Sequence, residues 1–381
     1  MPAWLTLLGV LLLALNLRAA IAGLPPLVPD LQADLHLDRG TAGLLSTLPV
    51  LCFGLLSPLG AVLGRRLGTE RALLLAMLSV AAGSLVRTVP GLCWVVCGTA
   101  LLGAGITVGN VLVPSAVKQG FPGSEGAVTG LYTAALIGGA ALSSALAAPL
   151  AHDAGLGWRG SLLVWGGLAA VAATVWLPQL RARHPAAARR GAHTRLWRSP
   201  VTWVLSLFMG TQALAYYGTL AWLPALLQDG GVSAAAAGWA LALFNLLGIV
   251  TSLVVPSVAG RRRDQRALGV LTCLVWGAGL VGLLAAPSLY LVWVALAGLA
   301  QGASISLALA MIVLRASTPA VARDLSGAAQ SAGYLLAAPG PILVGWLRDS
   351  SGGWQLPLLF LCATVAVMAA SSLGAGRDRQ V

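Results

Sequence analysis

An arginine lies inside an apolar stretch near the start of the chain. Arg18 comes 14 residues after Trp4, which places it about 21 Å along a helix. A cation at that depth of a hydrocarbon layer about 30 Å thick costs at least about 2.5–3.5 kcal/mol, so it must face protein, water or a counter-ion. A guanidinium presents a planar fork of N–H donors that suits a small anion. The position predicts an anion-binding site, although an arginine satisfied by backbone carbonyls at a helix break fits the sequence as well.

Neutral polar side chains occur in the apolar stretches too. Because each can hydrogen-bond a small polar solute, we expect a binding site that combines Arg18 with a set of them: Asn16, Asn110, Tyr132, Tyr216, Tyr217, Gln301, Gln330 and Tyr334. Each could equally bond a neighbouring helix, for about 0.6 kcal/mol. A second arrangement stays open, a stacking cage for a small neutral aromatic compound made of Tyr132, Tyr216, Tyr217, Trp222 and Tyr334.

Metal ligands and enzyme chemistry are not indicated. Cys93 and Cys97 share a helix face, but no histidine or carboxylate joins them, and a structural zinc site needs about four convergent ligands. No cluster of His, Asp, Glu, Cys or Ser falls at one depth of the apolar stretches, and no Gly-x-x-x-x-Gly-Lys-Ser/Thr run for ATP is present. We therefore expect no metal, no cofactor and no enzyme activity.

The elements that position these side chains must be membrane-spanning helices. Of the 381 residues, 58% are apolar and 9% are charged, against about 25% charged in a soluble domain. A soluble protein would expose too much apolar surface, and a disordered chain would be richer in charge. Apolar spans of about 20 residues fall at 4–26, 41–63, 72–90, 92–116, 126–149, 160–178, 201–227, 234–258, 268–286, 289–314, 326–346 and 356–374. We predict an all-α membrane protein with twelve transmembrane helices.

The basic residues indicate the orientation in the membrane. The net charge is +12, and most basic residues fall in alternate connections. The connections of the other face hold only Arg39, Arg87, Arg159 and Arg348. By the positive-inside rule the richer face is cytoplasmic. We predict a multi-pass protein of the cell (inner) membrane with both termini in the cytoplasm, in contact with the lipid bilayer and with no nucleic acid.

The chain consists of two similar halves. The Arg-rich stretch 179–199 is the only long polar connection between predicted spans. Two patterns recur 196 positions apart: Gly64-Arg65-Arg66 as Gly260-Arg261-Arg262, and Gly157-Trp158 as Gly353-Trp354. A six-span repeat with both copies in one orientation is the parallel duplication of major-facilitator transporters, which bind solute near the bilayer midplane. We predict two pseudo-symmetric six-helix bundles, residues 1–178 and 200–381, joined by a cytoplasmic linker at 179–199.

Five motifs of the N-terminal half resemble one known family. They are Asn16-Leu17-Arg18-x-x-Ile21, Leu48-Pro49-Val50-Leu51-x-Phe53-Gly54, Gly109-Asn110-Val111-Leu112-x-Pro114, Val117-Lys118-x-x-Phe121-Pro122 and Gly130-Leu131-Tyr132-Thr133. They are similar to the cyanate/2-nitroimidazole (CynX/NimT) transporter family, which the C-terminal half resembles mainly in its span pattern. The resemblance implies a major-facilitator permease for cyanate or related small solutes, and it favours Asn16, Arg18, Asn110 and Tyr132 as site residues.

One loop departs from the superfamily pattern. The loop after the second span usually carries an Asp before its arginine pair, and this chain has Gly64 there. Arg65, Arg66 and Lys118 are the expected gating residues of the cytoplasmic side. We expect a monomeric carrier that moves a small anion such as cyanate by alternating access around Arg18. The alternative is an exporter of small neutral heteroaromatics such as 2-nitroimidazole.

Overall fold

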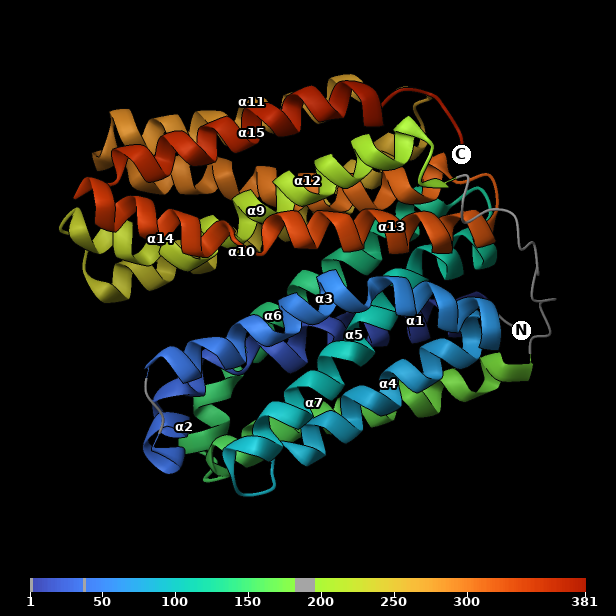
Figure 1. Ribbon diagram of the computed structural model, residues 1–381, viewed down its shortest axis with the longest axis horizontal. Coiled ribbons are helices and arrows are strands. Elements are labelled where there is room, and N and C mark those ends of the chain that lie inside the picture. The colour runs from blue at the N-terminus through green and yellow to red at the C-terminus, as the bar shows by residue number, and fades with distance from the viewer. Residues whose placement is uncertain (1–2, 37–38, 182–195) are drawn as a thin grey trace. The chain divides into compact units, whose positions relative to one another are not determined.

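The structure is a computed structural model that describes residues 3–36, 39–181 and 196–381 (Figure 1). Every regular element among these residues is a helix. In chain order they are α1 (Ala3–Ala22), η1 (Pro25–Leu27), α2 (Val28–Leu35), α3 (Arg39–Leu67), α4 (Thr69–Val86), α5 (Leu92–Gly120), α6 (Glu125–His152), α7 (Gly157–Trp176), η2 (Leu177–Arg181), α9 (Pro200–Asp229), α10 (Ala234–Gly260), α11 (Arg266–Ala285), η3 (Pro287–Leu289), α12 (Tyr290–Arg315), α13 (Pro319–Ala337), α14 (Gly340–Ser351) and α15 (Gln355–Ala375). Helices suit this apolar composition because they satisfy their own backbone N–H and C=O groups in lipid.

Ten helices of the described chain are long and apolar enough to cross a bilayer, judged by length and composition. Each corresponds to one of the predicted spans. α9 is not among the ten. It covers the predicted span 201–227 and is 30 residues long, but the polar side chains of Gln212, Tyr216 and Tyr217 lower its hydropathy. The predicted span 326–346 falls on α13 and α14.

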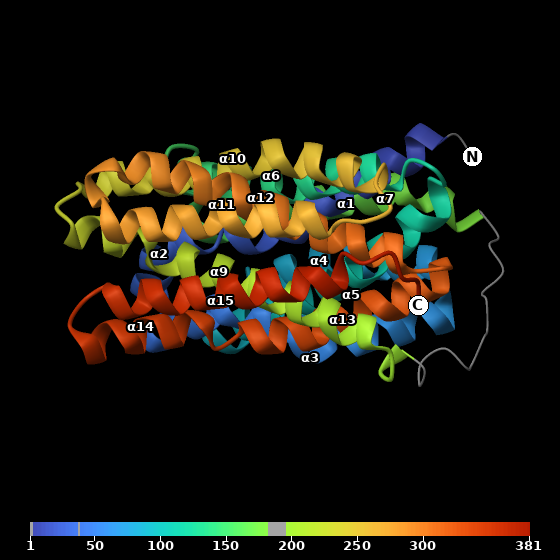
Figure 2. The same cartoon turned by 90° about the horizontal axis from the view of Figure 1, so that it is seen from above.

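That last span differs from the single helix predicted for it. α13 begins earlier, at Pro319, and a new helix begins at Gly340. Pro339 and Pro341 account for the break, because proline has no N–H to donate and its ring clashes with the preceding turn. α14 continues nearly along the line of α13 (Figures 1 and 2). The short helix α2 was not predicted either.

The chain divides into two compact units. The first consists of Met1–Pro122, Ala135–Arg190 and Thr318–Gly327, and the second of Gly123–Ala134, Gly191–Ser317 and Ala328–Val381. The first unit thus includes the beginning of α13, and the second includes the beginning of α6. Most of the predicted linker 179–199 lies outside the described residues, and the boundaries predicted for the two bundles stay predictions.

The same helix pairs pack together in each unit. In the first unit α5 packs against α3 and α4, and α1 packs against α7. In the second unit α12 packs against α10 and α11, and α9 packs against α15. This agreement is what a duplicated six-helix sequence requires.

Glycine makes the closest of these approaches possible. A Cβ atom on Gly98 of α5 would lie 2.6 Å from the carbonyl oxygen of Gly83 on α4, and a Cβ on Gly83 would lie 2.6 Å from the oxygen of Gly98. In the second unit a Cβ on Gly298 would lie 2.6 Å from the oxygen of Phe244. Small residues at such crossings let helix backbones pack directly on one another.

Candidate functional site

The two predicted site residues of α1 do not share one side of the helix. A step of two residues turns about 200° around an α-helix, so Asn16 and Arg18 point in nearly opposite directions. Asn16 is 2% exposed. Its Nδ2 donates to the oxygen of Leu12 at 3.0 Å, and its Oδ1 accepts from no described group. Arg18 is half-buried. The two side chains therefore meet different surroundings.

Asn110 lies close to this part of α1. Its neighbour Gly109 marks the crossing of α5 and α1, because a Cβ there would lie 2.6 Å from Cδ2 of Leu17. Asn110 itself is buried. The structure thus brings the motif around Asn16 and Arg18 and the motif around Asn110 to one crossing inside the first unit.

The first unit holds a second arginine that sequence reasoning missed. Arg87, which we counted with the connections although it falls near the end of the predicted span 72–90, is the C-cap of α4 and is only 1% exposed. Its Nε donates to Oγ1 of Thr99 at 2.9 Å, and its Nη1 donates to the oxygen of Ala20 at 3.0 Å. The alternative considered for Arg18 was an arginine satisfied by backbone carbonyls at a helix break. Arg87 is an arginine of this kind. The connection between α4 and α5 is short, and this shortness is the sequence signal that could have indicated the burial of Arg87.

Tyr132 belongs to the second unit. It lies on α6 and is buried. Two residues earlier, Gly130 packs against α10, where its Cβ would lie 2.9 Å from the oxygen of Leu253. The turn of α6 that carries Tyr132 thus packs on α10 within that unit through Gly130.

The second unit brings several predicted residues into an aromatic–amide cluster, which we define as Tyr216, Tyr217, Phe244, Asn245 and Gln301. The Tyr216 ring lies 5.1 Å from the Tyr217 ring and 6.2 Å from the Phe244 ring, centroid to centroid. The hydroxyl of Tyr216 donates to Oδ1 of Asn245 at 3.4 Å. Gln301 Nε2 donates to the oxygen of Phe244 at 3.3 Å. The cluster offers aromatic faces next to amide groups.

Gln330 and Tyr334 are buried on α13. They are four residues apart and so share one helix face. Gly333, beside Tyr334, packs against α9, because a Cβ on Gly210 would lie 3.0 Å from the oxygen of Gly333. The predicted residues of α13 therefore lie along the packing of α9 and α13 in the second unit.

Arg65 takes part in an ionic cluster inside the first unit, which we define as Arg65, Arg323 and Asp324. Nη1 of Arg65 lies 3.1 Å from Oδ1 of Asp324, and Nε of Arg323 lies 2.9 Å from the same oxygen. Asp324 is 4% exposed and lies inside α13, because this helix begins seven residues before the predicted span 326–346. A buried carboxylate of this kind needs cationic partners because burial disfavours an isolated charge.

The surroundings of Gly64 explain why this loop lacks the aspartate that is usual at this position in the superfamily. A Cβ at this position would lie 2.5 Å from Cδ2 of Leu112 and 2.6 Å from Cδ of Arg323. The stem of Arg323 therefore occupies the space that a side chain at position 64 would need. The carboxylate that pairs with Arg65 is that of Asp324, which lies on α13. The other two expected gating residues differ in environment, since Arg66 is exposed and Lys118 is half-buried.

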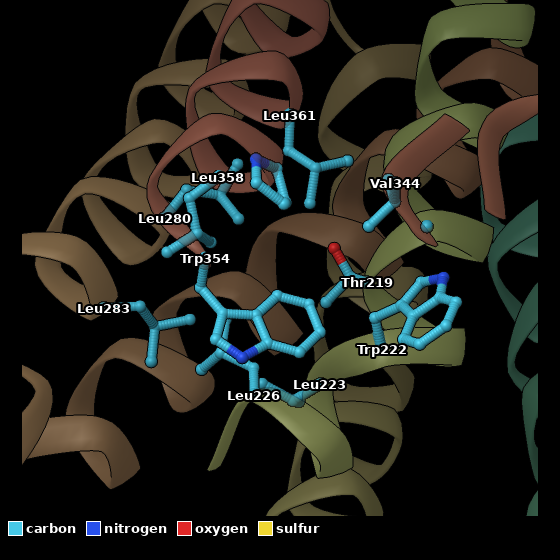
Figure 3. Close-up of a pocket in the computed structure, with 12 residues that line it drawn as sticks. Thr219, Trp222, Leu223, Leu226, Leu280, Leu283, Val344, Trp354, Leu358 and Leu361 are labelled. Carbon is cyan, nitrogen blue, oxygen red and sulfur yellow. The ribbon is translucent and has the colours of Figure 1, made fainter. Parts of the chain in front are cut away.

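A cavity lies in the second unit between α9, α11, α14 and α15 (Figure 3). Its walls are mainly leucine, with Thr219, Trp222 and Trp354. It encloses about 20 Å³, close to the space of one water molecule. Trp222 donates Nε1 to the oxygen of Pro341 at 2.8 Å, and its ring lies 6.1 Å from the Trp354 ring. Of the predicted residues only Trp222, from the alternative stacking cage, lines this space. Because the space is too small for an aromatic solute, we interpret it as a packing defect.

An ion pair lies next to this cavity. Arg348 Nη2 lies 2.8 Å from Oδ2 of Asp229, and Trp354 Nε1 donates to the same oxygen at 2.9 Å. These hydrogen bonds, from Arg348 first and Trp354 second, hold the pKa of Asp229 below its usual range. Asp229 is exposed, so solvent screens the interaction.

Comparisons with known proteins agree with the fold. The Major Facilitator Superfamily matches residues 7–338. The chain is similar to the 2-nitroimidazole transporter of Escherichia coli (strain K12), with 40% identity over 376 residues, 98% of this chain and 95% of that protein. It is 31% identical over 358 residues to the cyanate transport protein CynX of the same organism, covering 93% of this chain and 92% of that one.

A solved structure confirms the architecture. The chain superimposes on the Escherichia coli fucose:proton symporter FucP with a TM-score of 0.76 at 14% identity, covering 96% of this chain and 97% of that one. At this identity the likeness concerns the fold alone. The predicted all-α fold and the predicted resemblance to the cyanate and 2-nitroimidazole transporters are both confirmed. The chain belongs to the Major Facilitator Superfamily of membrane transporters.

Proposed function

We propose that the protein carries a small anion such as cyanate by alternating access of residues 1–178 against residues 200–381, around a site that contains Arg18. One observation carries this proposal: a guanidinium lies in α1, whose span Trp4–Ala22 has a mean hydropathy of 2.1. Ionisable residues inside such helices are costly, and they mark ion and substrate pathways. The guanidinium fork matches a small anion.

The surroundings of α1 favour a negative solute. Arg87 adds a second positive charge near the end of the same helix, and its hydrogen-bond partners are a neutral hydroxyl and a neutral carbonyl. Two such charges in one unit produce a positive potential, which raises the local concentration of anions. Asn110, at the crossing of α1 and α5, can add a neutral donor. The relative named for cyanate transport is similar over almost all of the chain.

A second candidate is export of small neutral heteroaromatics. The aromatic–amide cluster favours it, because Tyr216 and Tyr217 offer ring faces beside the amides of Asn245 and Gln301. Stacking and hydrogen bonding of that kind suit a planar heterocycle. The relative named for 2-nitroimidazole is 40% identical to this chain.

Uptake into proteoliposomes tests the two candidates. We expect the purified chain to take up labelled cyanate, Arg18→Gln to abolish that uptake, and Arg18→Lys to retain part of it because the charge remains. Tyr216→Phe is the matched variant for the second candidate, since it removes the hydroxyl and keeps the ring. If Arg18→Gln transports cyanate at the native rate, the anion proposal is wrong. If Arg18→Gln loses cyanate uptake but still transports 2-nitroimidazole, the two solutes bind to different side chains.

We propose that the ionic cluster gates the cytoplasmic side together with Arg66 and Lys118. The ion pair of Arg65 and Asp324 attaches residues 318–327 to the first unit, and α13 continues into the second unit from residue 328. Opening of the cytoplasmic side would then require this pair to break. Proton coupling is tested in the same vesicles, since equal accumulation with and without an imposed pH gradient would exclude it.

The orientation and assembly belong to the same proposal. We place both termini on the cytoplasmic side of the cell (inner) membrane and expect a monomer. The exposed arginines Arg66, Arg261, Arg262 and Arg263 support this orientation through the positive-inside rule. Labelling of single cysteines introduced at positions 66 and 262 in sealed right-side-out vesicles tests it. Reagents that do not cross the membrane should fail to reach either position.

A further inference from the structure

The C-terminal end of α1 is fully bonded by groups from several helices. The last four carbonyls of a helix have no partner within it, and in α1 these belong to Ala19, Ala20, Ile21 and Ala22. The backbone N–H of Gly23 still makes an α-helical bond to the oxygen of Ala19, four residues back, and the N–H of Leu24 bonds the oxygen of Ile21, three residues back, in a tighter turn. Two carbonyls then remain for side chains.

Side chains from α6 and α4 bind those two carbonyls. The hydroxyl of Ser144 donates to the oxygen of Ala22 at 2.8 Å. The guanidinium of Arg87 donates to the oxygen of Ala20 at 3.0 Å. A cation is favoured at this end of a helix because the helix dipole is negative there. Arg87 thus supplies both a donor and a charge to the end of α1.

The path of the Arg87 side chain is built into the packing of α4 and α5. Gly98 leaves room for it, because a Cβ there would lie 2.8 Å from the backbone nitrogen and 2.9 Å from Cγ of Arg87. Thr99, the next residue, accepts from Nε at 2.9 Å. The hydroxyl of Thr99 itself donates to the oxygen of Val95 at 2.6 Å. The guanidinium is therefore held at two points, one on α5 and one on α1.

We propose that Arg87 is a positioning residue for transport: its buried guanidinium fixes the end of α1 against α4 and α5 and thereby sets where Arg18 presents its charge. The bonded carbonyl of Ala20 is two residues beyond Arg18, within the same helical turn. A shift at this point moves the Arg18 side chain directly. The inference rests on the proposed role of Arg18 in binding the solute.

A second buried arginine, at the last residue of α12, offers a control in the second unit. Arg315 is also buried, and it donates to the oxygens of Ala375 and Gly376 at the end of α15, at 3.1 Å and 2.8 Å. It bonds Gln265 as well. α15 carries none of the proposed site residues. Loss of Arg315 therefore reports what losing a buried helix-capping arginine does to stability alone.

The test compares Arg87→Lys and Arg87→Gln with Arg315→Lys in the full-length chain. We measure KM and maximal rate of cyanate uptake in proteoliposomes, and hydrogen exchange of the backbone amides at residues 16–24. One hydrogen bond from a charged group can contribute about 10- to 100-fold. We expect Arg87→Gln to raise KM by that factor with the maximal rate within about twofold, and to speed exchange at the end of α1. Arg87→Lys should restore part of both, because an ammonium can still reach the Ala20 oxygen.

Thr99→Val covers the case in which Arg87→Gln fails to fold. It removes the acceptor on α5 and keeps the bond to Ala20, so exchange at the end of α1 should stay slow while the unfolding temperature falls. Arg315→Lys should lower the unfolding temperature and leave KM unchanged. A KM shift in Arg315→Lys equal to that in Arg87→Lys would overturn the inference, as would native exchange at residues 16–24 in both Arg87 variants.

The two proposals fail in different ways. If Arg87 variants loosen α1 while Arg18→Gln still transports cyanate, the proposed function is wrong and the attachment of α1 by Arg87 is real. If Arg18→Gln abolishes uptake while Arg87→Lys and Arg87→Gln keep the native KM, the positioning role of Arg87 is wrong.

Discussion

Gly98→Ala should destabilise the first unit strongly for so small a change. A methyl group at this position would lie 2.6 Å from the oxygen of Gly83, 2.8 Å from the backbone nitrogen of Arg87 and 2.9 Å from its Cγ. Two of these atoms are backbone, so α4 and α5 would have to move apart by several tenths of an ångström. Inserting a group into a packed core costs about 1–3 kcal/mol, and two backbone contacts put this site near the upper end.

The intrinsic preference of helices for alanine opposes that cost. Alanine is favoured over glycine in a helix by about 1 kcal/mol, so the net loss of stability should be about 2 kcal/mol. Gly167→Ala is the matched control, because Gly167 lies in α7 of the same unit and its Cβ would meet nothing within 4 Å. Thermal unfolding of the detergent-purified variants, followed by circular dichroism, should place Gly98→Ala below the native chain. Gly167→Ala should lie at or above it. If Gly98→Ala unfolds at the temperature of Gly167→Ala, the packing of α4 on α5 is looser than described.

Two further predictions concern carboxylates. Asp324→Asn should destabilise the chain by about 3 kcal/mol, at the lower end for a broken buried pair, because the Arg65 side chain is 28% exposed. In the same thermal assay Asp264→Asn, which breaks the exposed pair with Arg266 at 2.6 Å, should destabilise the chain far less than Asp324→Asn, because solvent screens exposed pairs. Asp229 has a pKa lowered by Arg348 and Trp354, so its stabilisation is present above the ordinary value of about 4 and is lost as the pH falls through the lower folded value. Asp229→Asn should therefore unfold earlier than the native chain at pH 7, and a gap that stays constant down to pH 3 would contradict the assignment.

Much of the fold could be predicted from the sequence because lipid imposes a single periodic requirement. Every span must be helical and about 20 residues long, so hydropathy alone located the helices. The break at Pro339 was harder to see, since prolines also occur inside unbroken helices such as α3 and α5. Whether proline kinks or divides a helix depends on its neighbours in space, which one sequence does not reveal.

The candidate site was less predictable, because burial at a helix end depends on tertiary packing. Arg18 stood out since it interrupts a long apolar run. Arg87 did not, because it lies near the end of its predicted span, next to Thr88 and Pro90, and was counted with a connection. Its burial depends on Gly98 and on the early end of α1. Asp324 falls just before the predicted span 326–346, and only the packing of α13 shows that it is buried beside Arg65.

The space filled by the Arg323 stem next to Gly64 has an evolutionary consequence. A larger residue at position 64 cannot coexist with both Leu112 and Arg323 as they lie now. Homologous chains that have an aspartate at position 64 must therefore have a shorter residue at position 323 or 112, or a shifted start of α13. Positions 64, 112 and 323 should therefore vary together among related chains. A larger residue at position 64 should be tolerated only together with a smaller residue at position 112 or 323.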